Sequence, residues 1–415
     1  MLKIYNFFYN LFALPMLFFL GFFIKKLGAG AKEKFGNYSF KSDKKTLWIH
    51  CVSVGEVMLA TTLLKKLDPS ESVILTTSTP QGQKMAQEKF SDRCAKITYF
   101  PYDTKFAIKN AIRAINPKMV LIMETEIWPN FANELKKQNI PLLIVNGRIS
   151  EATYKSYRYL KFFFKNVFKN YSYVLTQTPQ DAERFIKIGA DEKKVQNMGN
   201  IKFDLEKQDE KIKENYTQQF RTNGRKILIF GSTHGDENRL FVNSYKKLSK
   251  KIEDLKLIIA PRHLEKVEQI EKFLTSENIK YKKRSEGANF DECDVIILNT
   301  TGELGKVYSI CDICVLGGSF NNTGGHNPLE ATIWGKPVIS GPNVKNFRYI
   351  FKSLIEAKCA VIVNDEKELT QQVLNALIKN ECLAEFSQNC DLVLAKNRGA
   401  TEFLINFLNN FNNKE

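Results

Sequence analysis

Short apolar runs alternate with longer amphipathic segments along most of this chain. The runs are rich in Ile, Val and Leu, and the segments between them carry apolar residues at helical spacing, which is typical of parallel α/β structure. The strands expected in the first half cover residues 46–52, 72–77, 96–100, 119–123 and 141–146. Those expected in the second half cover residues 226–230, 255–260, 294–298, 313–316, 337–340 and 359–363. The pattern predicts two doubly wound, Rossmann-like α/β domains that face a cleft.

A polar, charge-dense stretch separates the two halves. Residues 206–225 contain almost no strand-forming sequence, so we interpret them as an interdomain linker that includes a helix. We therefore expect an N-terminal α/β domain over residues 28–205 and a C-terminal one over residues 226–395. The remaining residues, 396–415, have a helical pattern and can pack back on the first domain.

The N-terminus departs from this soluble pattern, because residues 7–24 are nearly continuously apolar. Eighteen helical residues span about 27 Å, which barely crosses the hydrocarbon core, and Asn10 and Pro15 interrupt the run. Lysines at 25, 26, 32 and 34 follow at once, which places the body of the protein on the cytoplasmic side. We predict a membrane anchor over residues 1–27, either a single span or a helix in the membrane plane; a packed core helix is the third reading.

The chain is strongly basic, with 61 Lys and Arg against 45 Asp and Glu and a formal charge of +16. An anionic partner is expected, and nucleic acid, acidic lipid and a phosphorylated substrate all fit this charge. Residues 154–169 interleave aromatic and basic side chains on an expected helix. This helix either meets anionic lipid or nucleotide, or simply has a basic, solvated face.

A glycine-rich segment follows the expected strand at 313–316 and leads into GGHNPLE at 324–330. Asn327 suits a helix N-cap, Pro328 the first helical position and Glu330 a position three after the cap. Glycines and a helix start favour a bound phosphate, although neither a P-loop nor a GxGxxG pattern is present; the alternative is a turn that caps a structural helix.

Three other expected strands in this half end in polar clusters, at residues 231–236, 261–263 and 301–303. Ligands of open α/β sheets bind outside the carboxyl ends of the strands, so these loops should converge with the glycine segment. Arg262 can pair with a phosphate, and Glu303 or Glu330 can accept from ribose hydroxyls.

Carboxylates occupy the corresponding positions of the first half. Glu56 follows the first strand and can serve as a general base or, alternatively, compensate the dipole of a helix start. Glu124 and Glu126 follow the strand at 119–123. No metal site is predicted, because the chain has no two Asp residues separated by one position and its four histidines sit in different segments without ligand-like pairing. Cys311 and Cys314 are interpreted as core residues of a strand.

Several motifs together resemble one family. They are HCVSVGEV (50–57), TSTPQG (77–82), METEIWPN (123–130), NGRIS (146–150), GNIKFD (199–204), APRH (260–263), TGEL (301–304) and GGSFNNTGGHNPLEA (317–331). In number, order and spacing they are similar to the motifs of the Kdo transferases, GT-B glycosyltransferases of lipopolysaccharide assembly that move 3-deoxy-D-manno-oct-2-ulosonic acid (Kdo). The resemblance covers nearly the whole chain and implies a GT-B fold.

The resemblance also implies roles for individual residues. Glu56 falls on the family's general base, and Glu124 and Lys202 fall where the family has residues proposed to stabilise the transition state. The positions that match the family's CMP-binding residues are Pro261, Arg262, Thr301, Gly302, Glu303, Asn327, Pro328, Leu329 and Glu330.

The implied reaction is a metal-independent, inverting transfer of Kdo from CMP-Kdo to a lipid A precursor, without a cofactor. The implied setting is the bacterial inner membrane with its anionic lipid, the catalytic body on the cytoplasmic side, and no nucleic-acid partner. Catalysis should require the two domains to close. The alternative is a GT-B transferase that uses another nucleotide sugar and a different lipid acceptor. The motifs do not tell how many Kdo units are added.

Overall fold

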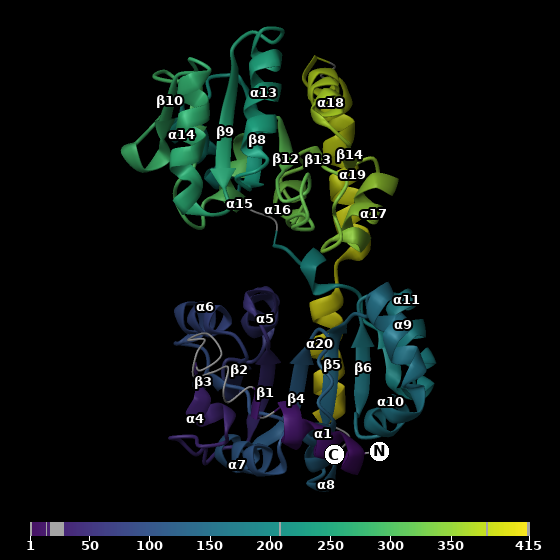
Figure 1. The fold of residues 1–415 in the computed structure, drawn as a ribbon. Helices are drawn as coiled ribbons and strands as arrows, with labels where there is room; N and C mark the ends of the chain where they lie inside the picture. Colours follow the sequence, from purple (N-terminus) through teal and green to yellow (C-terminus); the bar gives the residue numbers. More distant parts are fainter. Residues whose placement is uncertain (1, 14, 17–28, 207–208, 379–380, 413–415) are drawn as a thin grey trace. The chain divides into compact units, whose positions relative to one another are not determined.

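The computed structural model describes residues 2–13, 15–16, 29–206, 209–378 and 381–412. It divides into two compact units, the first formed by Met1–Asp204 with Asn397–Glu415 and the second by Leu205–Lys396 (Figure 1).

The first unit is built on a seven-stranded parallel sheet with the order β3-β2-β1-β4-β5-β6-β7. Its strands are β1 (Thr46–Cys51), β2 (Val73–Thr77), β3 (Lys96–Tyr99), β4 (Pro117–Met123), β5 (Leu142–Gly147), β6 (Tyr173–Thr176) and β7 (Val195–Asn197). Its longer helices are α5 (Val54–Lys66), α6 (Pro80–Phe90), α7 (Lys105–Ile115), α8 (Pro129–Lys137), α9 (Glu151–Tyr159), α10 (Lys161–Phe168), α11 (Pro179–Lys187) and α20 (Ala400–Asn412).

The two faces of this sheet support separate apolar cores. Successive side chains of a strand point to opposite faces, so Leu47 and Ile49 join one cluster and Trp48 the other. The first cluster is covered by α5, α6 and α20, the second by α7, α8, α10 and α11. Because helices cover both faces, the central strands are buried and read as continuous apolar runs.

The C-terminal helix α20 belongs to the first unit (Figure 1). Its Ala400, Leu404 and Leu408 are buried in the cluster that includes α5. Asp204 fixes its start, since the carboxylate accepts hydrogen bonds from the backbone N–H groups of Gly399 and Thr401. The chain therefore returns to complete the core of its first half.

The second unit repeats the architecture with the strand order β10-β11-β9-β8-β12-β13-β14, again entirely parallel. Its strands are β8 (Lys226–Thr233), β9 (Leu255–Pro261), β10 (Tyr281–Lys283), β11 (Val295–Ile297), β12 (Ile313–Leu316), β13 (Val338–Ser340) and β14 (Ala360–Ile362). Its helices include α12 (Glu210–Phe220), α13 (Asn238–Ser249), α14 (Val267–Ser276), α15 (Leu304–Val307), α16 (Leu329–Thr332), α17 (Arg348–Glu356), α18 (Glu366–Ile378) and α19 (Glu381–Asn397).

The structure contains all eleven strands expected from the sequence, with ends that differ by a few residues. It adds β6, β7 and β10, which have only three or four residues each, and β7 and β10 are sheet edges with polar sequences. Residues 206–225, expected as a linker, contain α12, whose Tyr216 and Phe220 are buried within the second unit. Cys311 and Cys314 are buried on or beside β12, which confirms them as core residues.

The N-terminal segment contains α1 (Leu2–Phe8) and the π-helical turn η1 (Tyr9–Ala13). The Tyr5 hydroxyl donates to Asp103 Oδ2 at 2.9 Å, and the Asp103 N–H donates to the Tyr9 hydroxyl at 3.1 Å. Among the residues that the structure describes, no helix has both the length and the apolar character needed to cross a membrane. Residues 1, 14 and 17–27 of the expected anchor lie outside the described residues.

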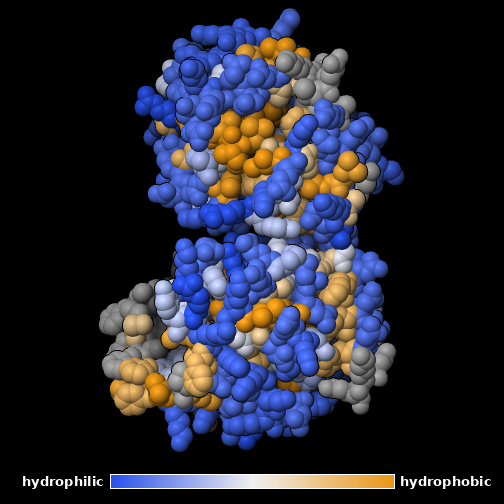
Figure 2. Space-filling view, turned by 90° about the vertical axis from the view of Figure 1, so that its right-hand side faces the viewer, coloured by the Kyte–Doolittle hydropathy of each residue, from blue (hydrophilic) through white to orange (hydrophobic). Residues whose placement is uncertain are grey.

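The surface is mainly hydrophilic on the face drawn in Figure 2, with smaller hydrophobic areas on both units. Large exposed apolar side chains of the first unit include Ile4, Phe7, Phe8, Leu11, Tyr159, Leu160 and Phe162. The last three lie where α9 ends and α10 begins, so the single helix expected over residues 154–169 is wrong. It breaks at Leu160, which closes α9 with a non-helical φ of −104° and ψ of 21°.

Candidate functional site

The site residues of the first unit gather at the topological switch point of its sheet. β1 has β2 on one side and β4 on the other, so the chain leaves β1 and β4 in opposite directions. Ligands of doubly wound sheets bind at the carboxyl ends of such strands. Glu56 follows β1 and Glu124 follows β4 directly, so both predicted catalytic carboxylates stand at this point.

Glu56 lies in the first turn of α5 and closes a capping box with Ser53. The backbone N–H of Ser53 donates to Glu56 Oε2 at 2.8 Å, and the Ser53 hydroxyl donates to the same oxygen. The sequence left a choice between a base and a helix-start residue, and the capping geometry shows that Glu56 performs the second role. The two roles are compatible, because the cap engages Oε2 and also fixes the direction of the carboxylate.

Glu124 forms an ion pair with Lys202, whose Nζ lies 3.2 Å from Glu124 Oε1. Both side chains are partly buried, about a quarter exposed or less, so the pair is less screened than a surface salt bridge. The backbone of Glu124 is left-handed, with a φ of 58°. A bulky residue adopts this conformation only where the surrounding structure enforces it, which is common at functional sites.

A buried polar network holds Lys202 in place. Asn200 caps the short turn η3 (Ile201–Phe203) through its own side chain. Asn146 Oδ1 accepts from the Ile201 N–H at 3.1 Å, while Asn200 Nδ2 donates to Gln177 Oε1 at 3.2 Å. Residues from the ends of β5, β6 and β7 thus converge on the turn that carries the lysine.

Glu126 is the fourth ionisable group of this edge. Burial, and then the nearby charge of Glu56, raise the pKa of Glu126 to about 7. The family resemblance gave a role to Glu124 and none to Glu126. A carboxyl group with a pKa near neutrality beside a second carboxylate is a candidate for proton transfer.

In the second unit, four loops follow four neighbouring strands. In sheet order they follow β11, β9, β8 and β12, and they carry TGE (301–303), PRH (261–263), GSTHGD (231–236) and the glycine segment (317–325). The convergence expected from the sequence is therefore confirmed by the strand order. The switch point of this sheet lies between β8 and β12.

The glycine segment packs closely against the loop after β8. A Cβ on Gly317 would lie 2.6 Å from the carbonyl oxygen of Ser232, and Gly318 has a φ of 67°. The N–H groups of Gly324 and Gly325 both donate to the Gly318 carbonyl, at 3.0 and 2.7 Å. These contacts require glycine and fold the segment back on itself.

The helix after this segment begins later than expected. α16 is a single turn that starts at Leu329, its N-cap is Pro328, and Asn327 Oδ1 accepts from the Leu329 N–H at 3.2 Å. Asn327 as N-cap and Pro328 as first helical residue are therefore wrong by one position, because Asn327 bonds the N–H two residues on, as in an Asx turn. One turn has a weak dipole, so side chains rather than the helix must supply most of the charge for an anion.

The predicted CMP-binding residues differ in what they expose. Arg262, Thr301 and Gly302 are exposed, whereas Pro261, Pro328 and Leu329 are buried, so Leu329 can offer a ligand only its backbone. Burial raises the pKa of Glu330. The hydrogen bond with Asn327 and the charge of Arg262 lower this pKa, but their effect is smaller than that of burial. A Cβ on Gly305 would lie 3.6 Å from Glu330 Oε2, which places Glu330 beside the first turn of α15.

The carboxylate of Glu303 is already engaged within its own unit. It accepts from the hydroxyls of Tyr216 and Thr300 and from Arg284. Burial alone would raise the pKa of Glu303, but the hydrogen bonds from Thr300 and Arg284 outweigh it and hold the pKa below its usual range. Of the two glutamates proposed for ribose, Glu330 has the fewer protein partners.

Three of the four histidines, which lie in different segments of the sequence, meet in the second unit. His234, His263 and His326 come from the loops after β8, β9 and β12, and the rings of His234 and His326 stack with their centroids 5.3 Å apart. His50 alone is separate: it is buried in the first unit against Phe100, and burial lowers its pKa to about 3. Because His234 and His326 are 92 residues apart, no local sequence pattern predicts their contact.

Glu237 is a second residue that the sequence did not single out. Its side chain is buried, and it accepts from the N–H groups of His234, Gly318 and Phe320 at 3.1, 2.7 and 2.8 Å. This carboxylate ties the loop after β8 to the glycine segment. A lone Glu in a charged loop gives no sequence signal for such a role.

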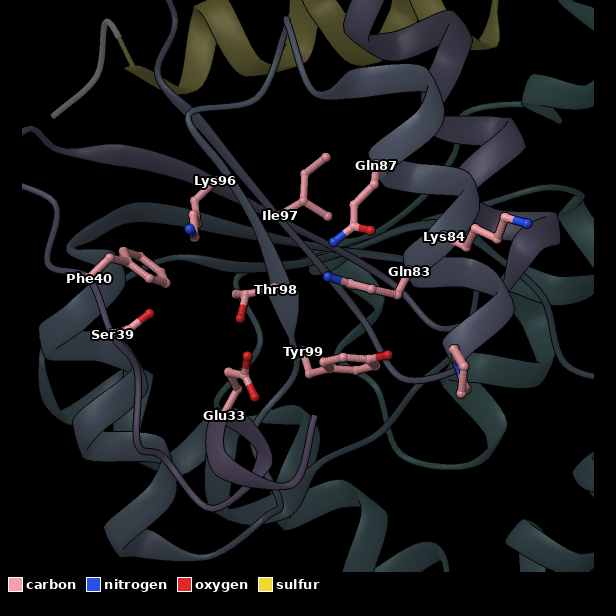
Figure 3. Close-up of a pocket in the computed structure, with 11 residues that line it drawn as sticks. Glu33, Ser39, Phe40, Gln83, Lys84, Gln87, Lys96, Ile97, Thr98 and Tyr99 are labelled. Atoms are coloured by element: carbon pink, nitrogen blue, oxygen red, sulfur yellow. The ribbon is translucent and has the colours of Figure 1, made fainter. Parts of the chain in front are cut away.

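Two of the cavities formed by the described residues are relevant here. One, of about 680 Å³, is lined by His234, Asp236 and Phe320–Thr323 at the glycine segment. The other, of about 380 Å³, lies against β3 and α6 in the first unit, where Glu33, Lys84 and Lys96 are among its lining residues (Figure 3). No predicted site residue lines the second cavity. Within the described part of the chain, no three His, Cys, Asp or Glu side chains are grouped so that they would hold a metal ion.

Two family models match the chain. Residues 29–205 match the model described as 3-deoxy-D-manno-octulosonic-acid transferase (kdotransferase), and residues 212–391 match glycosyl transferases group 1.

Individual relatives agree with these models. The chain is 33% identical over 386 residues to the 3-deoxy-D-manno-octulosonic acid transferase of Haemophilus influenzae, covering 91% of this chain and 90% of the relative. It is 35% identical over 353 residues to a bifunctional glycosyltransferase/methyltransferase of Fusobacterium nucleatum, covering 83% of this chain and 54% of that protein. The chain thus spans about half the length of the bifunctional relative.

A solved structure agrees on the fold. The UDP-GlcNAc 2-epimerase of Neisseria meningitidis bound to UDP-GlcNAc matches with a TM-score of 0.59 and 15% identity, over 88% of this chain and 99% of that one. The likeness shows a GT-B-like α/β fold, in which each unit contains one parallel sheet.

Proposed function

The chain belongs to the Kdo transferase family of glycosyltransferases, and from that premise we propose that it transfers Kdo from CMP-Kdo to a hydroxyl group of a lipid A precursor, with inversion at the anomeric carbon. The observation that carries the proposal is the gathering of Glu56, Glu124 and Lys202 at one switch point, each on a motif of this family.

Glu56 is the general base of the proposed reaction. Ser53 holds Oε2, and we assign the incoming proton of the acceptor hydroxyl to Oε1. The acceptor oxygen then forms a bond to the anomeric carbon of Kdo, and the bond between that carbon and the phosphate oxygen of CMP breaks on the opposite face. A well-placed base contributes about 10²- to 10⁴-fold to such a step.

Charges that are already in place stabilise the transition state. The oxocarbenium-like centre carries positive charge and the departing CMP phosphate carries negative charge, so carboxylates and cations are both needed. Glu124 and Lys202 supply one of each, held 3.2 Å apart. Arg262 pairs with the phosphate, and we propose a metal-independent reaction that requires no cofactor.

The second unit binds the nucleotide part of the donor. The loops after β9, β11 and β12 bring Arg262, Gly302 and Glu330 to one edge of the sheet. Glu330 accepts from a ribose hydroxyl, and backbone N–H groups of the exposed Thr301–Glu303 loop contact the base or sugar.

An assay with purified enzyme tests the proposal. Radiolabelled CMP-Kdo and UDP-sugars are offered in turn with the tetraacylated disaccharide precursor of lipid A, and the lipid product is analysed by mass spectrometry. Kdo incorporation is expected only from CMP-Kdo. Incorporation from a UDP-sugar alone would replace this function by the alternative, a GT-B transferase for another nucleotide sugar.

We further propose that the N-terminal segment holds the protein at the cytoplasmic face of the inner membrane, with anionic lipid as a partner. The exposed Phe7 and Phe8 on α1 support this proposal, as does the net charge of +16. Replacing both phenylalanines with Glu should lower binding to vesicles of anionic lipid in flotation experiments. The exposed Phe106, changed in the same way, is the matched control.

A further inference from the structure

The stacked histidine pair of the second unit is not used by the reaction as derived above. His234 Nε2 and His326 Nε2 lie 3.0 Å apart, at hydrogen-bond distance. A neutral imidazole carries one N–H and one acceptor nitrogen, so one ring of the pair must present an N–H and the other a lone pair at this contact. The two rings therefore share a single proton on the Nε2–Nε2 axis.

Neighbouring residues make room for the histidine pair and fix its position. A Cβ on Gly318 would lie 3.0 Å from His326 Nε2, so glycine at this position makes room for the ring. The buried Glu237 holds the His234 N–H and the Gly318 N–H together, which fixes the backbones on both sides of the pair. His234 also lines the 680 Å³ cavity, so the pair borders a space that a ligand can enter.

The pair is neutral in the ligand-free protein. Burial, then the positive charge of Arg262, lower the pKa of His326 to about 4. Burial also lowers the pKa of His234, although the charges of Glu237 and Asp236 act in the opposite direction. At pH 7 both imidazoles are therefore uncharged, and the positive charge of Arg262 acts on both of them.

Further charged groups face this region from the neighbouring elements. His263, from the loop after β9, lies with its ring centroid 5.6 Å from that of His234, and its Nδ1 is 3.6 Å from Glu265. Lys345 also contacts the glycine segment, because its Nζ donates to the Asn322 carbonyl at 2.9 Å. Glu330 follows His326 by four residues and interacts with Arg262.

We propose that the His234–His326 pair is an oxyanion-binding element that takes up one proton when the anionic part of the donor binds. This inference rests on the proposed function, because it deepens the donor site of the second unit. The oxyanion is a phosphate or a sugar carboxylate, the two acidic groups of a nucleotide-activated sugar acid. Neither histidine belongs to the residues assigned to CMP above.

The uptake follows from electrostatics. An oxyanion placed beside the pair favours its cationic form and raises its pKa, as an opposite charge does at any ionisable site. The incoming proton comes from solvent and binds the ring nitrogen whose lone pair is not used in the contact between the two rings. The pair then becomes a cation with an N–H directed at the anion. One N–H bond forms on the imidazole and one O–H bond of the solvent donor breaks, and no other covalent bond changes.

Proton uptake makes binding depend on pH with a defined sign. Because the bound state holds more protons than the free state, affinity falls as pH rises, by at most about tenfold per pH unit for one proton. The slope extends from the low pKa of the free pair up to the raised pKa of the bound pair. The second ionisation of the CMP phosphate, near pH 6, acts in the opposite direction and is the same for every variant.

Titration calorimetry of the full-length protein with CMP tests the inference. Measurements at pH 7 in two buffers with different ionisation enthalpies give the number of protons taken up. We expect a net uptake approaching one proton in the wild type and none in His234→Gln, together with about tenfold weaker binding of CMP by the variant. His263→Gln is the matched control, a histidine of the same cluster outside the pair, and should retain the uptake.

A second arm identifies the source of the oxyanion. If CMP binds without proton uptake, free Kdo is titrated into the CMP complex, and uptake at that stage assigns the pair to the carboxylate. Absence of uptake in both arms while CMP binds overturns the inference and leaves the proposed function standing. Failure of the wild type to bind CMP overturns both. The proton count of the wild type needs no variant, so it remains decisive if His234→Gln does not fold.

Discussion

Each of the two units is built on a seven-stranded parallel sheet, but the side chains at the two switch points differ in chemistry. Both have seven parallel strands, and both carry polar residues near the carboxyl ends of the two strands that flank the switch point, β1 and β4 in the first unit and β8 and β12 in the second. In the first unit these residues are Glu56, Glu124 and Lys202; in the second they are glycines, Arg262 and the histidine pair. In the proposed reaction the first set transfers a proton and the second binds an anion, so the same fold would support two functions through different loop residues.

The backbones of the two edges differ for the same reason. In the first unit Glu124 and Asn146 adopt a left-handed conformation despite their side chains, because those side chains are needed there. In the glycine segment of the second unit Gly318, Gly324 and Gly325 have positive φ values, and the N–H groups of Gly324 and Gly325 donate to the Gly318 carbonyl. The first unit thus keeps functional side chains at positions with a left-handed backbone, whereas the glycine segment of the second unit has glycines at such positions and makes backbone contacts.

The largest effect is expected from removing the cation of the first unit. Lys202→Met should lower kcat by about 10²- to 10³-fold, because it removes a charge placed for the transition state and leaves Glu124 half-buried without its partner. Steady-state kinetics of Kdo transfer measure the change. The matched control is Lys118→Met, which breaks the 2.8 Å ion pair between Lys118 and Glu71. Neither residue is a predicted site residue, so this variant should retain activity.

The second effect concerns the stability of one unit only. Leu404→Ala opens a cavity in the cluster that α20 shares with α5, and should cost about 2–5 kcal/mol of unfolding free energy. Hydrogen exchange should report the loss in the first unit and not in the second. The exposed Leu392→Ala on α19 should leave both unchanged. Equal destabilisation of both units by Leu404→Ala would contradict the assignment of α20 to the first.

The third effect is a pH dependence confined to the first unit. Glu126 has a folded pKa of about 7, above its unfolded value, so the folded state binds more protons than the unfolded state between roughly pH 4.5 and 7. Stability is therefore lost as pH rises through this window. Glu126→Gln should remove that loss and gain about 1–2 kcal/mol relative to the wild type between pH 5 and pH 8, allowing for solvent screening.

Urea unfolding at the two pH values measures this gain. The exposed Glu88→Gln, on α6, is the control and should follow the wild type at both pH values. A Glu126→Gln curve parallel to the wild type would show that Glu126 is not buried against Glu56.

The smallest effect separates the two roles of Glu56. Ser53→Ala breaks the capping box but keeps the carboxylate, so it should cost about 1 kcal/mol of stability and only a few-fold in transfer rate. Thermal unfolding and kinetics on the same sample measure both. A loss of rate as large as that of a Glu56 variant would mean that orientation by Ser53 is itself essential.

Much of the fold and part of the site could be predicted from the sequence. The central strands were found because burial on both faces gives continuous apolar runs, whereas β7 and β10 are short, polar edges without that signal. Glu56 could be placed because it opens the helix after a strand, and Arg262 because it directly follows a strand. The histidine pair and Glu237 could not, because their roles arise only when loops 92 and 81 residues apart meet at neighbouring strands.

The central claim is that proton transfer belongs to the first unit and donor binding to the second. The most direct test measures two quantities, the kcat for Kdo transfer and the Kd for CMP, on Glu56→Gln and Arg262→Ala. Gln at position 56 can keep the capping box while losing the base, so the account predicts a kcat lowered by about 10²- to 10⁴-fold with an unchanged Kd for CMP. Arg262→Ala should instead weaken CMP binding by about tenfold or more. Full turnover by Glu56→Gln, or a loss of CMP binding equal to that of Arg262→Ala, would contradict it.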